Sequence, residues 1–180
     1  MPTSIEIKAY CNNKQAIKEI LLSNGAKLQA TDHQTDTYFH SKSGRLKLRE
    51  GKAENQLIHY IREDKKGCKK SKVVLYKSNT DSSLKEILEK TVGSKCIVDK
   101  IREIYLIDNV IFHIDTVKGL GNFVEIEAMD TNGTIPTEKL QEQCNHYIKI
   151  LEINAKDLLA ESYSDLLQQN QLFNQILIDE

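Results

Sequence analysis

Hydrophobic and polar residues alternate along much of the chain, and this two-residue period is typical of β-strands. We expect about eight extended segments, each bounded by turn residues such as glycine, asparagine and aspartate. The predicted strands cover residues 4–10, 27–40, 45–49, 57–62, 72–76, 96–107, 110–117 and 123–128. Most of them adjoin the next strand along the chain, which favours antiparallel pairing.

Other stretches carry apolar residues at the three- and four-residue spacing of an amphipathic helix. Three such stripes lie between residues 13 and 25, 83 and 93, and 137 and 151, and a short fourth helix is expected over 163–167. The predicted class is therefore α+β, with residues 1–167 forming one domain. The tail over 168–180 is rich in glutamine and asparagine, and we expect either a docking helix or a disordered segment there.

Several predicted strands have an apolar face and a face with charges of both signs. A single strand of this kind is most simply a strand with one solvated face. The pattern recurs, however, and the helices need an apolar surface on which to pack. We therefore expect a closed or nearly closed antiparallel eight-stranded barrel, with helices outside and charged side chains lining the interior. The charged pairs are Glu6 and Lys8, Lys47 and Arg49, Lys100 and Arg102, His113 and Asp115, and Glu125 and Glu127.

Composition narrows the class of protein. Of the 180 residues, 39% are hydrophobic and 28% are charged, and no stretch reaches the ~20 apolar residues of a membrane span. The N-terminus lacks the pattern of a secretory signal, so we expect a cytoplasmic protein with no membrane partner. With 25 basic and 26 acidic residues, the net charge of −1 argues against a nucleic-acid partner. The four cysteines are widely spaced and are expected to be reduced thiols rather than zinc ligands.

Charges inside a barrel are costly unless they are paired or meet a ligand. A polyanion bound together with a divalent cation would satisfy both signs. Lysine and arginine side chains hold phosphate oxygens, while carboxylates hold Mg²⁺ or Mn²⁺. The alternation therefore indicates a site for a metal-bound phosphate compound.

Five blocks along the chain resemble the CYTH superfamily. The first, SIEIK over residues 4–8, resembles the family's Glu-x-Glu-x-Lys signature, and the most specific, FHIDTVKGLGNFVEIE over 112–127, is most similar to the class IV adenylate cyclase branch. The other three blocks are 36–39 with 46–49, 100–102 and 162–167. The superfamily also includes thiamine triphosphatase and inorganic triphosphatases, and the resemblance implies a triphosphate tunnel fold.

The resemblance also implies roles for individual residues. The implied ligands of Mg²⁺ or Mn²⁺ are Glu6, Asp115, Glu125 and Glu127. The implied triphosphate-binding residues are Lys8, Lys47, Arg49, Arg62, Lys72, Lys100 and Arg102. The strand phase of Lys72 can be read either way, and Arg62 stands where many members have lysine. The lysine-rich run over 65–70 is expected to be a solvated loop or a guard at the tunnel mouth.

One position departs from the family pattern, because Ser4 stands where the signature has a carboxylate. The expected activity is conversion of ATP to cyclic AMP and pyrophosphate, with a small-molecule triphosphate as partner and a monomer or homodimer as assembly. The alternatives are hydrolysis of an inorganic, thiamine or nucleoside triphosphate, and, because of Ser4, a module that binds a triphosphate or polyphosphate without turnover. The first two reactions can use the same tunnel, so the fold does not decide between them.

Overall fold

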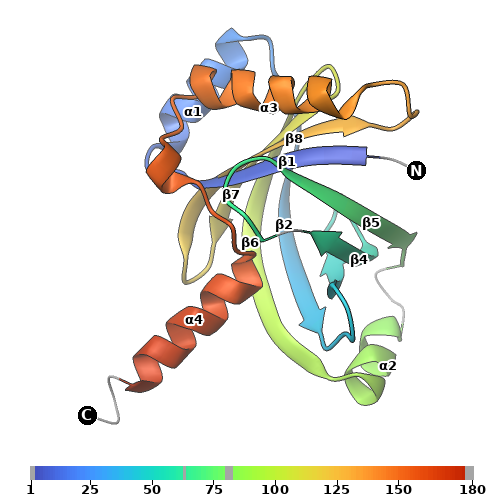
Figure 1. The fold of residues 1–180 in the computed structure, drawn as a ribbon. Helices are drawn as coiled ribbons and strands as arrows, with labels where there is room; N and C mark the ends of the chain where they lie inside the picture. The colour runs from blue at the N-terminus through green and yellow to red at the C-terminus, as the bar shows by residue number, and fades with distance from the viewer. Residues whose placement is uncertain (1–2, 63, 80–82, 177–180) are drawn as a thin grey trace.

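A closed barrel of eight antiparallel strands forms the body of the protein (Figure 1). The structure, a computed structural model, describes residues 3–62, 64–79 and 83–176. The strands are β1 (Thr3–Tyr10), β2 (Lys27–Phe39), β3 (Arg45–Glu50), β4 (Gln56–Arg62), β5 (Lys69–Lys77), β6 (Ser94–Ile107), β7 (Val110–Val117) and β8 (Gly121–Asp130). Their order around the barrel is β1-β5-β4-β3-β2-β6-β7-β8. The predicted fold class and barrel are thus confirmed.

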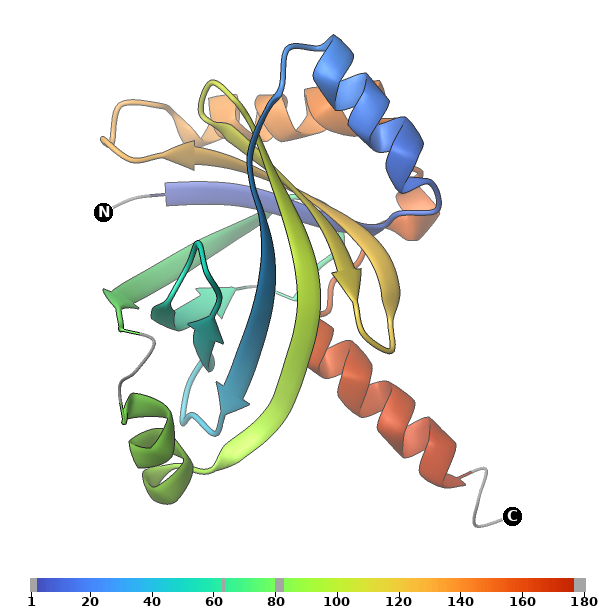
Figure 2. The same cartoon turned by 180° about the vertical axis from the view of Figure 1, so that it is seen from behind.

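Two helices cover the outer surface of β1, β7 and β8. Helices α1 (Lys14–Ser23) and α3 (Thr137–Ile150) lie on this side of the barrel in both views (Figures 1 and 2). The outward side chains of these strands, among them Ile7 and Phe112, pack with Leu140 and Cys144 of α3 in one buried cluster. Burying each large apolar side chain contributes ~1.5–3 kcal/mol. This cluster therefore fixes the outward phase of the strands, and with it the inward phase of their charged residues.

A second buried cluster fills one end of the barrel interior. It is formed mainly by inward side chains of the strands, and it includes residues at the start of helix α4 (Tyr163–Ile176). Its buried members are Tyr38, Ile58, Tyr60, Val98, Val117, Phe123, Leu159, Tyr163 and Leu166. Ser162 and Asp165 hold the beginning of α4 by exchanging hydrogen bonds, from Ser162 Oγ to Asp165 at 2.7 Å and from the Asp165 amide to Ser162 Oγ at 3.2 Å. The segment before α4 includes a short 3₁₀ helix (Ala155–Asp157) and contacts this end of the barrel, where the Leu159 amide donates to the Lys8 carbonyl at 2.9 Å.

Two local predictions need correction. The basic run over 65–70 is not all loop, because β5 begins at Lys69 and the Lys69 side chain is 0% exposed. The expected short helix over 163–167 continues to Ile176, and Leu172 and Phe173 near its end are more than 60% exposed, so α4 projects from the barrel (Figure 2). Residues 177–180 of the tail lie outside the described residues.

The remaining helix, α2 (Leu84–Thr91), lies close to the end of β2 and the start of β6 (Figure 2). None of the helices in the described part of the chain is long and apolar enough to cross a membrane.

Candidate functional site

The barrel encloses a cavity of about 410 Å³, lined by side chains from all eight strands. Nine of the eleven residues that the resemblance implies as ligands line it together. They are Glu6, Lys8, Lys47, Arg49, Arg62, Lys100, Arg102, Glu125 and Glu127. Alternation places them there, because β1 and β8 turn Ile5, Ile7 and Ile126 outward to the helices and the charged residues between them inward.

Three cations of this lining share one buried carboxylate, Asp36 of β2. Its side chain accepts hydrogen bonds from Lys47 Nζ at 2.8 Å, from Arg49 Nε at 2.8 Å and Nη2 at 3.0 Å, and from Lys100 Nζ at 2.8 Å. Asp36 is 1% exposed, and burial alone would raise its pKa, but Arg49, Lys100 and Lys47 hold that pKa well below the usual range. Asp36 thus orients cations contributed by β3 and β6. The sequence prediction assigned it no role, although its inward phase with Tyr38 on β2 could have revealed it.

The lysines around Asp36 are short of negative charge. Burial, together with the nearby arginines Arg49 and Arg102, lowers the pKa of Lys47 to about 8 and that of Lys100 to about 7. Asp36 opposes these effects but is a single carboxylate shared among three cations. An added anion would stabilise the charged form of both lysines.

Carboxylates gather on the neighbouring strands β1 and β8. In the register of this pair Glu6 lies directly opposite Glu127, and Lys8 lies opposite Glu125. Burial, and then the nearby Glu6 and Glu125 charges, raise the pKa of Glu127 to about 7. Such a group of like charges is costly unless a cation joins it.

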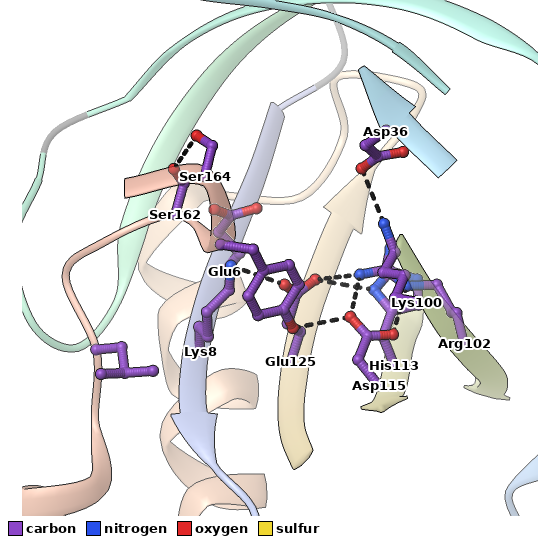
Figure 3. A network of polar contacts seen from close by, with 12 residues as sticks. Glu6, Lys8, Asp36, Lys100, Arg102, His113, Asp115, Glu125, Ser162 and Ser164 are labelled. Atoms are coloured by element: carbon purple, nitrogen blue, oxygen red, sulfur yellow. Dashed lines mark hydrogen bonds and ion pairs between the residues drawn. The ribbon is translucent and has the colours of Figure 1, made fainter. Parts of the chain in front are cut away.

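Basic side chains hold Glu125 in a charged state. Lys8 Nζ lies 3.1 Å from Glu125 Oε1, and Arg102 Nη2 and His113 Nδ1 lie 3.0 and 3.3 Å from Oε2 (Figure 3). Burial would raise the pKa of Glu125, but Lys8 and Arg102 hold it well below the usual range. His113 therefore contacts Glu125 and lines the cavity beside it.

Two predicted site residues are placed differently. Asp115 is 0% exposed and does not line the cavity; Arg102 Nε and Nη2 donate to it at 2.7 and 2.6 Å, and the Tyr163 hydroxyl donates at 2.8 Å (Figure 3). Its geometry orients Arg102, and its implied metal role stays a prediction. Lys72 is exposed on β5 between two cavity-lining residues, Ser71 and Val73, so strand alternation turns its side chain outward. Its position gives its implied triphosphate role no support.

Other basic contacts tie the closed end of the barrel to the site. Lys69 Nζ donates to the carbonyls of Leu159 and Ala160 at 2.6 and 2.9 Å. Arg62 donates to Glu6 at 2.6 Å and to the Ala160 carbonyl at 3.3 Å, while its buried Nε has no partner among the described residues. Lys8 Nζ lies 3.6 Å from the centre of the Tyr163 ring. Sequence reasoning missed Lys69 and Tyr163, because their contacts join segments that lie far apart along the chain.

The carboxylates provide the oxygen donors that Mg²⁺ and Mn²⁺ prefer. As the side chains stand, no three histidine, cysteine, aspartate or glutamate groups in the described ranges are placed to hold one ion. Glu6 forms an ion pair with Arg62, and Glu125 forms ion pairs with Lys8 and Arg102. The carboxylate oxygens therefore fit such a metal, provided that a bound anion replaces the carboxylates as the partner of these basic side chains.

Comparison with known proteins identifies the family, since the family model of the CYTH domain matches residues 3–163. The chain belongs to the CYTH domain family. It is 27% identical over 173 residues to the Methanocaldococcus jannaschii protein named "Putative adenylate cyclase MJ0240", covering 90% of this chain and 97% of that protein.

The solved structures that share the fold of this CYTH domain include two that illustrate the range of similarity. The PH1012 protein from Pyrococcus horikoshii superposes with a TM-score of 0.76 at 21% identity, over 91% of this chain and 98% of that chain. The Hippeastrum protein HpAC1, described as a "putative adenylyl cyclase" with a dominant triphosphatase activity, superposes with a TM-score of 0.62 at 15% identity, over 93% and 96% of the two chains.

Proposed function

We propose that this CYTH protein is a divalent-metal-dependent enzyme that converts ATP to cyclic AMP and pyrophosphate, as in class IV adenylate cyclases. The observation that carries the proposal is the division of one cavity wall into two parts. The cations around Asp36 face the interior from β3 and β6, and the carboxylates Glu6, Glu125 and Glu127 face it from β1 and β8. A triphosphate with its metal ion is a ligand that matches both.

Each set of side chains has a task in this proposal. Lys47, Arg49 and Lys100 bind phosphate oxygens and stabilise the charge that develops on the leaving pyrophosphate. Arg102 is held in place by Asp115 and reaches the boundary between the two sets. Glu6, Glu125 and Glu127 would hold Mg²⁺ or Mn²⁺, which when bound neutralises and polarises the phosphoryl oxygens.

The internal ion pairs suggest how the two halves of the ligand cooperate. In the free protein Arg62 engages Glu6, and Lys8 engages Glu125. Phosphate oxygens would compete for these cations and release the carboxylates, which then suit a divalent ion. We therefore expect the metal ion and the triphosphate each to increase the protein's affinity for the other.

Hydrolysis of the triphosphate is the second candidate, favoured by the similarity in fold to the Hippeastrum protein, for which a dominant triphosphatase activity is described. Incubation with ATP and Mn²⁺ followed by product analysis separates the two reactions. The cyclase releases cyclic AMP with pyrophosphate, and the triphosphatase releases ADP with phosphate. The matched control is Glu125→Gln, which keeps the size of the side chain. If neither product set forms with ATP, tripolyphosphate or thiamine triphosphate, the enzyme proposal is refuted.

Ser4 motivates a third candidate, a triphosphate- or polyphosphate-binding module without turnover. Ser4 lines the cavity on β1, where the family signature has a carboxylate. Ser4→Glu should raise activity sharply if the missing carboxylate limits metal binding. Ser71→Glu is the matched control, because Ser71 also lines the cavity and lies opposite Ser4 in the β1–β5 register. A wild-type enzyme that already turns over quickly would eliminate the binding-module candidate.

A further inference from the structure

Two of the four cysteines, Cys68 and Cys144, lie beside each other although they are far apart along the chain. All four cysteines are free thiols in the structure. Cys144 belongs to the buried cluster between the barrel and α3, and Cys68 packs against that cluster. Cys68 Sγ lies 3.5 Å from Oδ1 of Asn145, the residue that follows Cys144 on α3. The two thiols also lie within hydrogen-bonding range of each other.

Strand alternation and the order of strands around the barrel bring these two thiols together. Lys69, the first residue of β5, pairs with Glu6, whose side chain lines the cavity. The preceding residue, Cys68, therefore lies on the outer face of the barrel, where α3 packs on the neighbouring strand β1. Cys144 lies on the face of α3 that is turned to the barrel, and its Sγ donates to the Ile5 carbonyl of β1 at 3.2 Å. The proximity of the thiols thus follows from the pairing of β1 with β5 and the packing of α3.

The two thiols differ in access and in acidity. Cys68 is half-buried, whereas Cys144 is 0% exposed, so only Cys68 can meet a reagent from solution. The hydrogen bond with Cys144 and the nearby Lys65 charge lower the pKa of Cys68 to about 7, although burial opposes them. The contact with Cys68 and burial raise the pKa of Cys144. Because the thiolate is the nucleophile in disulfide chemistry, Cys68 is suited to react first and Cys144 second.

A bond between these thiols would reinforce the strand pairing that has the fewest residue pairs in the described barrel. Strands β1 and β5 pair at three positions, Ser4 with Ser71, Ile5 with Lys70 and Glu6 with Lys69. Every other neighbouring pair of strands has more. Helix α3 already packs on β1 and β8. A covalent link from α3 to the start of β5 would therefore hold β5 against β1.

We propose that Cys68 and Cys144 form a redox site, where a small disulfide compound oxidises them to an intramolecular disulfide that links the start of β5 to α3. In the first step the Cys68 thiolate attacks one sulfur of the oxidant, and the other half of the oxidant leaves as a thiolate and takes up a proton. In the second step the Cys144 sulfur attacks Cys68 and gives up its proton to the departing second half of the oxidant. Two protein thiols are thus oxidised and one disulfide compound is reduced to two thiols, and an excess of thiol reverses the reaction. The site lies outside the charged cavity and does not depend on the proposed function.

The test exposes the full chain to oxidised glutathione, alkylates the remaining thiols under denaturing conditions, and maps the peptides by mass spectrometry without reduction. We expect wild type to lose two of its four free thiols and to yield the Cys68 peptide linked to the Cys144 peptide. The oxidised protein should gain about 5–10 °C in Tm, because the bond closes a long loop of the unfolded chain. Dithiothreitol should reverse both changes.

Single substitutions separate the roles of the two cysteines. Cys144→Ala should stop at the first step and keep one glutathionyl group on Cys68. Cys68→Ser should leave Cys144 unmodified, because its thiol is 0% exposed. Cys96→Ser is the matched control, because Cys96 is half-buried like Cys68 but lies on β6 against the other buried cluster, and this variant should still form the disulfide. Thermal unfolding of each reduced variant checks that the fold is retained.

Three results would overturn the proposal. The first is a wild-type protein that keeps all four thiols or carries only glutathione adducts. The second is a disulfide that joins other cysteines, and the third is a bond between Cys68 and Cys144 that leaves Tm unchanged. Glutathione attached to Cys144 in Cys68→Ser would refute the order of attack. The wild-type map and Cys68→Ser decide the question even if Cys144→Ala unfolds.

Discussion

Replacement of Asp36 by asparagine should destabilise the free protein and strengthen its binding of phosphate compounds. Asp36 is 1% exposed and is the shared partner of Lys47, Arg49 and Lys100. Removing one partner of a buried ion pair typically costs ~3–5 kcal/mol, because the remaining charge is left without compensation. For a chain of this size, 1 kcal/mol changes Tm by about 2–4 °C, so we expect Tm to fall by about 10 °C.

The same change removes a negative charge from beside the proposed phosphate site. One charge at this range affects the binding of an anion by at least ~1.4 kcal/mol, which is about tenfold in affinity. At a tripolyphosphate concentration that stabilises wild type by ~2.7 kcal/mol, Asp36→Asn should therefore gain ~4.1 kcal/mol. Thermal unfolding with and without tripolyphosphate measures both effects. The variant is thus expected to be less stable alone but to recover more when the anion is added.

Asp32→Asn is the matched control on the same strand. Asp32 is 2% exposed, and its carboxylate accepts hydrogen bonds from the amides of Lys52 and Ala53 at 2.8 and 3.1 Å. This variant should also lose stability, but tripolyphosphate should stabilise it no more than it stabilises wild type. If the anion rescues both variants equally, or if Asp36→Asn is as stable as wild type, the assigned role of Asp36 is wrong.

The charges of the cavity support three further predictions. Affinity for tripolyphosphate should fall as pH rises above about 7, because Lys100 and Lys47, with pKa values of about 7 and 8, must take up protons to bind the anion. Calorimetry in buffers of different ionisation enthalpy should show this proton uptake. Its absence would count against these lysines as ligands. Glu127→Gln should abolish metal-dependent activity and should raise Tm at pH 8 more than at pH 5. The reason is that a carboxyl group with a folded-state pKa raised to about 7 makes the folded protein less stable as pH rises towards that value. A variant that unfolds instead would mean that Glu127 is structural. Lys47→Ala should reduce kcat/KM for ATP by at least about 100-fold while Lys72→Ala stays within about threefold of wild type, and a similar loss in both would contradict the outward placement of Lys72.

Strand alternation in the sequence predicted the barrel and most of its charged interior, because each strand must turn its apolar face to the helices or to the core. Ile5, Ile7 and Ile126 go outward, and the charged residues between them go inward. The sequence prediction could not settle Lys72, where the run from 69 to 77 alternates weakly and carries apolar residues on both faces. The register with β1 decides it, because Ser71 pairs opposite Ser4 and faces the cavity.

Contacts between segments that lie far apart along the chain could not be predicted from the alternation of residues within each strand. The pairing of Asp115 with Arg102 depends on the β6–β7 register, and the Tyr163 hydroxyl that reaches Asp115 comes from the start of α4. Lys69 likewise donates to the carbonyl of Leu159, in the segment that precedes α4. A basic run in a sequence is usually solvated, and only the fold shows which of its members is buried.

Under the proposed function, the aromatic cluster at one end of the barrel would determine the order in which the products leave. Tyr38, Tyr60, Phe123 and Tyr163 are buried together at that end, so under the proposed function substrate and products would pass through the opposite end, beside Val73 and Leu75. A substrate would enter with its phosphates leading and its organic group last. The released pyrophosphate or phosphate would then lie behind the organic product and could leave only after it. Product release would therefore be ordered, with the organic product leaving first. The inorganic product, as the last to leave, would compete directly with the next substrate molecule for the site.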